Sequence, residues 1–162
     1  MVMPERFSVL IAGSGQLGSR YLQGLVDCLN PLRIFVYDPA DGSRHTAAER
    51  WSEAGGPSTK HVVSYHDVLD NVSTDLDIAI VATTAAVRPM VVELTTEWAQ
   101  VRMWILEKVL AQSESDLGRI AAAIGERSNA WVNTWGRMTP WYHQMRSQDC
   151  DGPVRFGVEG GS

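Results

Sequence analysis

Residues 7–18 read Phe-Ser-Val-Leu-Ile-Ala-Gly-Ser-Gly-Gln-Leu-Gly, an apolar run of strand length that leads directly into three glycines. The glycines have the spacing G-x-G-x-x-G, which alone is a weak signal. Here a strand-like run precedes it and a helical pattern follows it, as dinucleotide binding requires. The helical pattern is a stripe of side chains on one face, Leu17, Tyr21, Leu25 and Cys28. The stretch therefore predicts a strand, a tight turn and a helix that together form a phosphate-binding site.

Each glycine has its own physical task in such a turn. Gly13 permits the tight turn, Gly15 leaves bare backbone against which a pyrophosphate can rest, and Gly18 lets the helix pack closely on the strand. The start of the helix adds N–H groups and the positive end of its dipole. We expect the pyrophosphate to be bound by Gly13, Ser14, Gly15, Gln16, Leu17 and Gly18. The alternative is a glycine-rich turn that binds no ligand.

An acidic residue follows the next strand-like run. Asp38 comes 20 residues after Gly18, where a carboxylate accepts hydrogen bonds from the hydroxyls of the adenosine ribose. It would repel the 2′-phosphate of NADP, so the sequence favours NAD, although Ser43 and Arg44 are close enough in sequence to leave NADP open. The alternative for Asp38 is a solvated turn residue before Pro39.

Apolar runs of strand length alternate with helical patterns along the chain. This alternation predicts an α/β fold, a doubly wound, mostly parallel Rossmann-type sheet with helices on both faces. The runs are Phe7 to Ala12, Arg33 to Tyr37, His61 to Val63, Asp77 to Ala82, Val101 to Leu106 and Ala130 to Thr134. In such a sheet, ligands lie outside the carboxyl ends of the strands, where the strand order reverses.

Local signals predict where helices start and where loops lie. Pro89 suits a first helical turn, and Ser113 with Asp116 forms a capping box. Ser64 with Asp67 repeats that signature. Two segments with Gly, Pro, Ser and Asp are typical of loops, Asp38 to Arg44 and Gly55 to Lys60.

Length and composition limit the possible functions. The chain has 162 residues, of which 44% are hydrophobic, and a formal net charge of -5. We expect one dinucleotide-binding domain at 1–147, with 148–162 as a linker and the first strand of a truncated second domain. Without a basic run, nucleic acid is not an expected partner. Nor does any apolar run suit a signal peptide or a membrane helix, so we expect a cytoplasmic protein, and the scattered histidines predict no metal site.

Two predicted strands end in polar residues at the expected ligand edge. The fourth run leads to Thr83 and Thr84, and the fifth leads to Glu107 and Lys108. A lysine there could hydrogen-bond a substrate hydroxyl or the nicotinamide ribose, and could take part in the proton transfer that accompanies hydride transfer. The alternative is an ordinary lysine that pairs with Glu107 or is solvated.

The order of the glycine turn, Asp38, residues 82–84 and the Glu107-Lys108 pair resembles the N-terminal half of the Gfo/Idh/MocA oxidoreductase family. A later set is similar to the family's segment between its two domains, namely Asn133, Arg137, Pro140 and Tyr142. The resemblance implies a two-domain enzyme that oxidises or reduces a sugar, cyclitol or related polyol through NAD(P). It also implies that Lys108 lies at the active site and that Thr83, Thr84 and Glu107 belong to the coenzyme site.

The chain departs from the family pattern at several positions. The family's Glu-Lys-Pro is Glu107-Lys108-Val109 here, and valine makes a cis bond far costlier than proline does. Arg88 replaces a family histidine, and it either meets an acidic substrate group or faces solvent. Arg137 is either a substrate ligand or part of a structural ion pair. The family's catalytic Asp and His lie in its second domain, beyond Ser162.

Two alternatives stay open for the function. A methyltransferase also has a glycine turn followed by an acidic residue, but the third glycine and the absence of an acid before the turn favour a nicotinamide coenzyme. A non-catalytic dinucleotide-binding sensor or regulatory module is the other alternative. Four aromatic residues lie near the end of the chain, Trp131, Trp135, Trp141 and Tyr142. They suggest either a wall on which a sugar stacks or a patch that another domain covers. An exposed aromatic patch would also favour a homo-oligomer.

Overall fold

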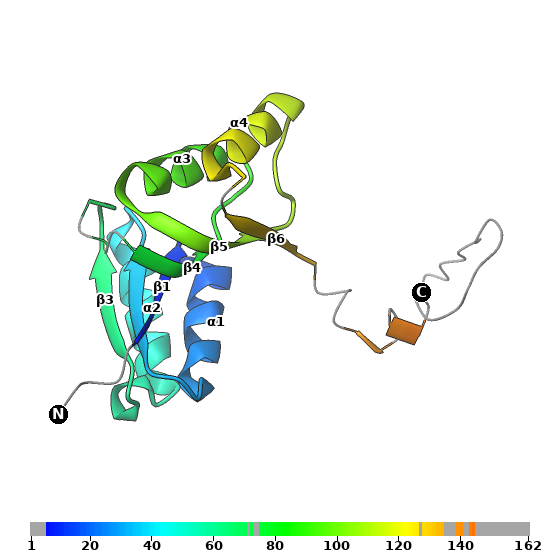
Figure 1. The fold of residues 1–162 in the computed structure, drawn as a ribbon. Coiled ribbons are helices and arrows are strands. Elements are labelled where there is room, and N and C mark those ends of the chain that lie inside the picture. The colour runs from blue at the N-terminus through cyan, green and yellow to red at the C-terminus, as the bar shows by residue number, and fades with distance from the viewer. Residues whose placement is uncertain are drawn as a thin grey trace, which may run out of the picture.

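The computed structural model describes residues 6–70, 72, 75–126, 128–134, 139–140 and 143–144. Within them, six strands form one sheet (Figure 1). The strands are β1 (Phe7–Ala12), β2 (Leu32–Tyr37), β3 (Val62–His66), β4 (Asp75–Val81), β5 (Gln100–Glu107) and β6 (Asn129–Asn133). Each strand overlaps the run predicted for it, and no strand end differs from the predicted end by more than three residues.

The sheet has the order β3-β2-β1-β4-β5-β6, and every neighbouring pair is parallel. Ala12 at the end of β1 is opposite Tyr37 in β2 and opposite Val81 in β4. The carboxyl ends of these three strands therefore meet at one edge, and the strand order reverses between β1 and β4. The predicted doubly wound α/β fold is confirmed.

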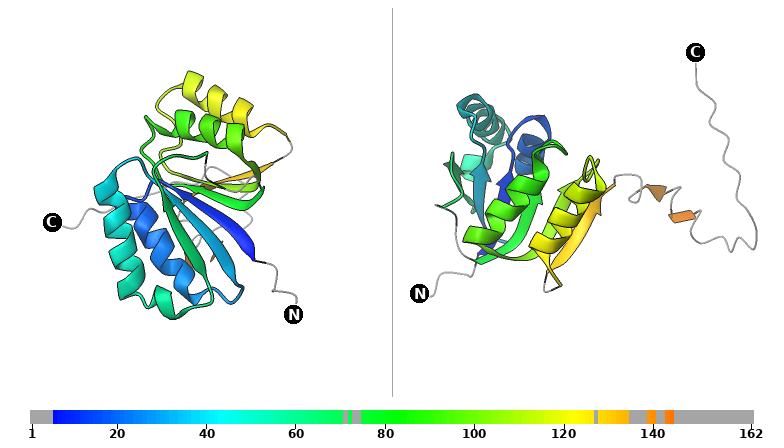
Figure 2. Two further views of the ribbon diagram at one scale, coloured as in Figure 1. Left: turned by 90° about the vertical axis from the view of Figure 1, so that its left-hand side faces the viewer. Right: turned by 90° about the horizontal axis from the view of Figure 1, so that it is seen from above.

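Helices cover both faces of the sheet (Figure 2). They are α1 (Gln16–Gly24), α2 (Asp41–Glu53), α3 (Arg88–Trp98) and α4 (Glu114–Ile124), with short 3-10 turns at Leu25–Asp27 and Gly56–Ser58. Side chains alternate along β1, so Ile11 packs with Leu22 of α1, whereas Leu10 packs with Val92 of α3. Each pair of helices therefore encloses its own apolar core.

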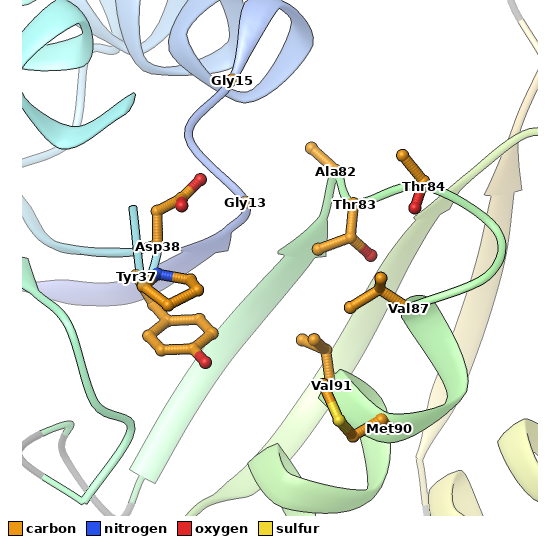
Figure 3. Close-up of a pocket in the computed structure, with 11 residues that line it drawn as sticks. Gly13, Gly15, Tyr37, Asp38, Ala82, Thr83, Thr84, Val87, Met90 and Val91 are labelled. Carbon is orange, nitrogen blue, oxygen red and sulfur yellow. The ribbon is translucent and has the colours of Figure 1, made fainter. Parts of the chain in front are cut away.

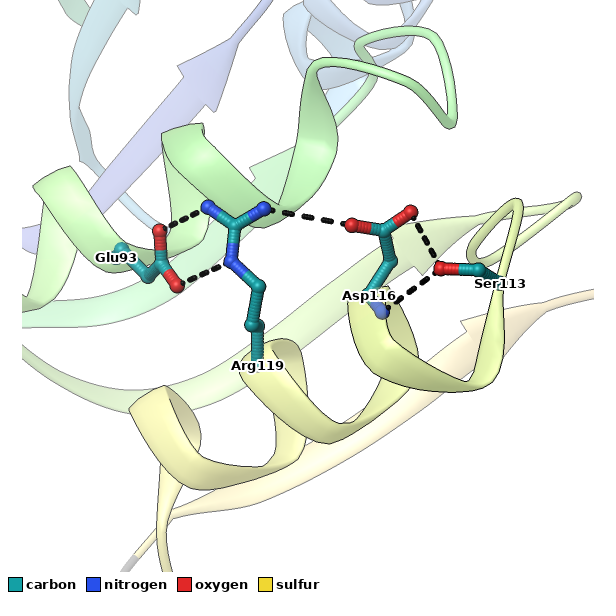
Figure 4. A network of polar contacts seen from close by, with 4 residues as sticks. All are labelled: Glu93, Ser113, Asp116 and Arg119. Atoms are coloured by element: carbon teal, nitrogen blue, oxygen red, sulfur yellow. Dashed lines mark hydrogen bonds and ion pairs between the residues drawn. The ribbon is translucent and has the colours of Figure 1, made fainter.

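Helices α3 and α4 begin as the sequence predicts. Pro89 lies in the first turn of α3, and the Ser113 hydroxyl caps α4 by accepting a hydrogen bond from the Asp116 N–H at 3.1 Å. Arg119 of α4 then joins Glu93 of α3, with Nη2 at 2.6 Å from Oε2 (Figure 4). This exposed network joins the two helices, which also pack through the apolar core at Val92 and Ile120.

Three local predictions are wrong, of which two concern the places where helices begin and the third concerns the buried face of α1. The segment Asp38 to Arg44 is a loop only as far as Ala40, because α2 begins at Asp41, an acidic residue that suits a first helical turn. Ser64 lies inside β3 instead of before a helix, since its strand pairs with β2 in register.

The stripe predicted for α1 is also shifted. Leu17 is 45% exposed, and the fully buried apolar side chain of α1 is Leu22. The helix gives way to a 3-10 turn at Leu25, so Cys28 lies beyond it. Gly18 and Ser19 share the buried face with Leu22 because small residues allow close contact with β1.

No helix in the described part of the chain is both long and apolar enough to cross a membrane. The predicted boundary at 147, with a linker and strand at 148–162, lies outside the described residues.

Candidate coenzyme-binding site

The glycine turn has the geometry predicted for two of its glycines. Gly13 has a φ of +88°, and a Cβ there would lie 2.9 Å from Thr83 Cγ2. At Gly18, a Cβ would lie 1.8 Å from the carbonyl oxygen of Gly13, so helix and turn are in contact. A Cβ at Gly15 would meet no atom within 4 Å. The turn therefore has two glycines that the fold needs and one with an open side.

Donor groups surround that open side. Gly15 is the N-cap of α1 and makes no side-chain cap, so the first N–H groups of α1, at Gln16 and Leu17, are not capped by a side chain. Ser14 is buried, and its hydroxyl has no hydrogen-bond partner among the described residues. Helix N–H groups and a dipole of this kind suit an anion. The residues present fit a pyrophosphate at this place.

Asp38 follows β2 and is held by the turn itself. Its Oδ2 accepts a hydrogen bond from the Ser14 N–H at 2.7 Å, and its Oδ1 accepts one from the Ala40 N–H at 2.9 Å. The carboxylate is thereby fixed beside the glycine turn, and each oxygen keeps a lone pair for a further donor. A ribose with two hydroxyl donors fits this arrangement.

Arg44 of α2 lies next to Asp38. Its Nη1 donates to the Asp38 carbonyl oxygen at 2.6 Å, and its Nη2 donates to Asp41 Oδ1 at 2.8 Å. The guanidinium therefore lies beside Asp38 and is already bound to an acidic residue.

A groove of about 290 Å³ runs from Asp38 past the glycine turn to the loop after β4 (Figure 3). One side carries Tyr37 and Asp38, and the other carries Thr83, Thr84 and the start of α3. The lining also includes apolar residues that sequence reasoning missed, Tyr37, Pro39, Ala82, Val87, Met90 and Val91. An apolar slot beside a polar turn suits a flat base joined to a diphosphate.

The signal for the missed residues was present but indirect. Val87, Met90 and Val91 surround the start of α3, which lies at the ligand edge because it follows β4 after a short loop. Val87 and Met90 are exposed although they are apolar. Helical periodicity alone could not separate a groove wall from a core face, because both are apolar.

Thr83 and Thr84 lie where the sequence predicts, at the end of β4 in the groove wall. The Thr83 hydroxyl is buried and has no partner in the described part of the chain. A ligand in the groove could supply that partner.

Glu107 ends β5 and is 6% exposed, so its carboxylate is not open to solvent. Its Oε1 accepts hydrogen bonds from the Tyr21 hydroxyl of α1 and from Asn133 Nδ2 of β6, the latter at 2.8 Å. Burial, together with the hydrogen bond and the charge of Glu107, raises the pKa of Tyr21 to about 12. The three side chains tie α1, β5 and β6 together. The contact of Glu107 with the coenzyme stays a prediction.

Lys108 follows β5 at the same edge of the sheet and is exposed. Among the described residues no ion pair joins Lys108 to Glu107. The Lys108–Val109 peptide bond is cis, although its second residue is valine and not proline.

Arg88 does not face solvent, which corrects one expectation. Its side chain is 1% exposed, and its guanidinium donates to the main-chain carbonyls of Thr83 and Leu110, at 2.5 and 2.9 Å, and to that of Val109. Arg88 is buried because α3 begins beside the loop after β4 and the loop after β5, whose carbonyl groups accept its hydrogen bonds. A contact of Arg88 with substrate stays a prediction, and Arg137 and three of the four predicted aromatic residues lie outside the described residues.

Fold and groove together define a Rossmann-type α/β domain in which the carboxyl edge of the sheet carries a glycine turn, a fixed carboxylate and a lysine. No family model and no curated protein matches this sequence. Solved structures with the same fold do exist. The similarity is at the level of structure, because the sequences are less than 20% identical.

Three such structures are informative. Myo-inositol dehydrogenase from Lactobacillus casei, in complex with NAD(H) and myo-inositol, has a TM-score of 0.68 and 14% identity over 88% of this chain and 40% of its own. Myo-inositol 2-dehydrogenase from Lactobacillus plantarum has a TM-score of 0.63 and 15% identity, with 88% and 40% covered. A super-repressor mutant of Gal80p from Saccharomyces cerevisiae has a TM-score of 0.65 and 17% identity, with 86% and 37% covered.

The chain therefore spans about 40% of the length of these proteins. The Rossmann-type fold that the family resemblance implies is confirmed.

Proposed function

We propose that this chain is the coenzyme-binding part of an NAD(P)-dependent oxidoreductase of the Gfo/Idh/MocA type. The observation that carries the proposal is the groove at the reversal of strand order, where Gly15 presents an open side and Asp38 a fixed carboxylate. The two inositol dehydrogenases of the same fold support an oxidoreductase.

The residues have distinct tasks in this proposal. The N–H groups at the start of α1 bind the pyrophosphate, and Asp38 accepts hydrogen bonds from the adenosine ribose. A nicotinamide held at the other end of the groove would supply hydride transfer to or from the substrate. Lys108 donates a hydrogen bond at the reacting carbinol oxygen and helps to move its proton.

We propose NAD as the preferred coenzyme, because the fixed Asp38 carboxylate repels a 2′-phosphate. The substrate class that we propose is a sugar, cyclitol or related polyol or carbonyl compound. Its support is the family resemblance and the fold shared with proteins described as myo-inositol dehydrogenases. A cytoplasmic location, a homo-oligomer, and substrate contacts of Arg88 and Arg137 stay predictions.

A second candidate is a non-catalytic module that recognises a dinucleotide and regulates a partner. The specific observation in its favour is that a super-repressor form of Gal80p has the same fold. The two candidates share the coenzyme site and differ in whether turnover follows.

The test has two stages. Tryptophan fluorescence is first titrated with NADH and NADPH, and quenching at micromolar to millimolar ligand is expected, with NADH bound more tightly. Turnover is then measured on a panel of sugars and polyols, with this chain and with any longer form encoded by its gene. Turnover in either form supports the enzyme, whereas binding without turnover in both supports the regulatory module. If neither dinucleotide binds at millimolar concentration, the proposed function is wrong.

A further inference from the structure

Arg88 is a charged residue in an unusual place, at the first position of α3 with a side chain only 1% exposed. Burial of a guanidinium is costly unless its donors are hydrogen-bonded and its charge is balanced. A cation at a helix start is also unfavourable, because the helix dipole is positive there. The position therefore needs a compensating arrangement.

Three main-chain carbonyls provide the hydrogen bonds. Nη2 donates to the Thr83 carbonyl at 2.5 Å, and Nη1 donates to the carbonyls of Val109 and Leu110, the latter at 2.9 Å. Thr83 belongs to the loop after β4, and the other two residues belong to the loop after β5. One planar guanidinium thus joins two loops that are more than 20 residues apart in sequence.

Glu107 provides the opposite charge. Burial lowers the pKa of Arg88, and the attraction of the Glu107 carboxylate acts against this change. Glu107 is itself held by Tyr21 and Asn133. The cation is therefore balanced by an acid whose position the sheet has already fixed.

The two loops that Arg88 joins carry the residues at the reactive end of the proposed site. Thr83 and Thr84 line the groove, and Lys108 directly precedes Val109. In the described part of the chain, the hydrogen bonds of the Arg88 side chain do not reach the adenosine side of the groove at Tyr37, Asp38 and Pro39. A change at Arg88 should therefore disturb the side of the groove at Thr83 and Thr84 more than it disturbs the adenosine side.

We propose that Arg88 is a positioning residue for the nicotinamide half of the coenzyme. Its guanidinium holds the loop of Thr83 and Thr84 and the loop of Lys108 at the separation at which both border the nicotinamide ring. A lysine keeps the charge but cannot reproduce the planar fork that reaches two loops. This inference rests on the proposed function, since it assumes that a nicotinamide dinucleotide binds in the groove.

The test compares NADH with ADP-ribose, which has the same adenosine and pyrophosphate but no nicotinamide. Affinities are measured by calorimetry for the unaltered chain, for Arg88→Lys and for Arg88→Met. We expect NADH to bind the unaltered chain more tightly than ADP-ribose. In Arg88→Lys we expect NADH affinity to fall about tenfold, as the loss of a hydrogen bond from a charged group would produce, while ADP-ribose affinity changes less than about twofold.

Ile120→Val is the matched control for a merely structural effect. Ile120 is buried in α4 and its side chain belongs to the core around α3, so its truncation lowers stability without removing a contact to either loop. We expect its ratio of NADH to ADP-ribose affinity to equal that of the unaltered chain. An equal loss for both ligands in Arg88→Lys, or no loss for either, overturns the inference.

A second measurement, by NMR, uses the unaltered chain and therefore does not depend on whether a variant folds. Nε of Arg88 is buried and has no partner among the described residues, so its N–H resonance reports on the surroundings of the guanidinium. NADH should shift this resonance more than ADP-ribose does, and equal shifts overturn the inference. If the unaltered chain binds neither ligand, the proposed function fails and the inference fails with it. A normal NADH affinity with an unchanged ratio in Arg88→Lys removes the inference alone.

Discussion

At the scale of single residues, Gly15 separates what the fold requires from what a ligand requires. Its φ of -62° is open to any residue, and a Cβ there meets no atom within 4 Å. Gly15→Ala should therefore leave the free energy of unfolding within about 0.5 kcal/mol of its original value. It should weaken NADH binding by about tenfold or more, because the methyl group occupies the open side of the turn. Urea unfolding and a fluorescence titration measure the two effects.

Two other glycines serve as controls for that prediction. Gly24 at the end of α1 also has nothing within 4 Å of a Cβ, but it does not line the groove, so Gly24→Ala should change neither stability nor affinity much. Gly18→Ala should instead destabilise the chain, since its Cβ would lie 1.8 Å from the Gly13 carbonyl oxygen. Unchanged NADH affinity in Gly15→Ala would contradict a pyrophosphate at this turn.

Coenzyme preference also belongs to the scale of residues, and two carboxylates contribute to it. Asp38 is beside the ribose position, and Asp41 holds the guanidinium of Arg44 at 2.8 Å. In Asp38→Ser the repulsion of a 2′-phosphate is lost, but Arg44 stays paired. We expect Asp41→Asn to add about a further threefold to NADPH affinity in that background, the size typical of an exposed ion pair. Titrations of both single variants and the double variant with NADPH and NADH give the coupling.

Glu53→Gln is the matched control, because it changes the net charge equally at the other end of α2. It should leave the ratio of NADPH to NADH affinity unchanged. Arg44→Met in the double variant should remove the added NADPH affinity. If it does not, Arg44 takes no part in coenzyme choice.

At the scale of elements, the contact of Tyr21 with Glu107 and Asn133 joins α1 to β5 and β6. The pKa of Tyr21 is raised to about 12, chiefly by burial and then by Glu107. An unfolded chain ionises tyrosine near pH 10. A group whose pKa is raised on folding contributes stability that is present below about pH 10 and is lost as the pH rises towards 12. The free energy of unfolding should therefore fall across this interval.

Urea unfolding between pH 9 and 12 measures that fall. It should be smaller in Tyr21→Phe, although not absent, because burial also raises the pKa of Tyr37 and Tyr65. In Glu107→Gln, phenolate absorbance should show that Tyr21 ionises at a lower pH than in the unaltered chain. An identical decline in Tyr21→Phe would mean that this contact does not control the alkaline stability.

The elements also explain which features could be predicted from sequence. Strands of a parallel sheet are buried on both faces, so they appear as continuous apolar runs, and the run at residues 7–12 matches β1 at both ends. The capping of α4 by Ser113 is local and was equally visible. The start of α2 was not, because Asp41, Gly42 and Ser43 are as typical of a turn as of a first helical turn.

The site divides in the same way. The places of Gly13, Gly18 and Asp38 were predictable because they depend on backbone geometry within one β-α-β unit. The burial of Arg88 and the contact of Glu107 with Asn133 depend on loops and strands that only tertiary structure brings together. An exposed role was the natural expectation for an arginine, since charged residues are rarely buried.

At the scale of the whole molecule, the groove lies where the β3-β2-β1 half of the sheet meets the β4-β5-β6 half, at the direct pairing of β1 with β4. Gly13, Gly15 and Asp38 come from the half with α1 and α2, whereas Thr83 and Met90 come from the half with α3. A dinucleotide that contacts both halves binds only the folded chain. It should therefore raise the free energy of unfolding by about 2.7 kcal/mol at a concentration 100 times its Kd.

Thermal unfolding at increasing NADH concentration tests this linkage over the whole chain. The midpoint should rise continuously with the logarithm of NADH concentration above Kd, by several degrees per hundredfold, and the Kd derived from the rise should agree with the fluorescence titration. AMP, which has the adenosine and one phosphate but no nicotinamide riboside, should produce a smaller rise at the same concentration because it cannot reach the loop after β4. Gly15→Ala should reduce the effect of NADH towards that of AMP. An equal rise with AMP and NADH would restrict binding to the adenosine side, and the two halves would then not be linked by the coenzyme.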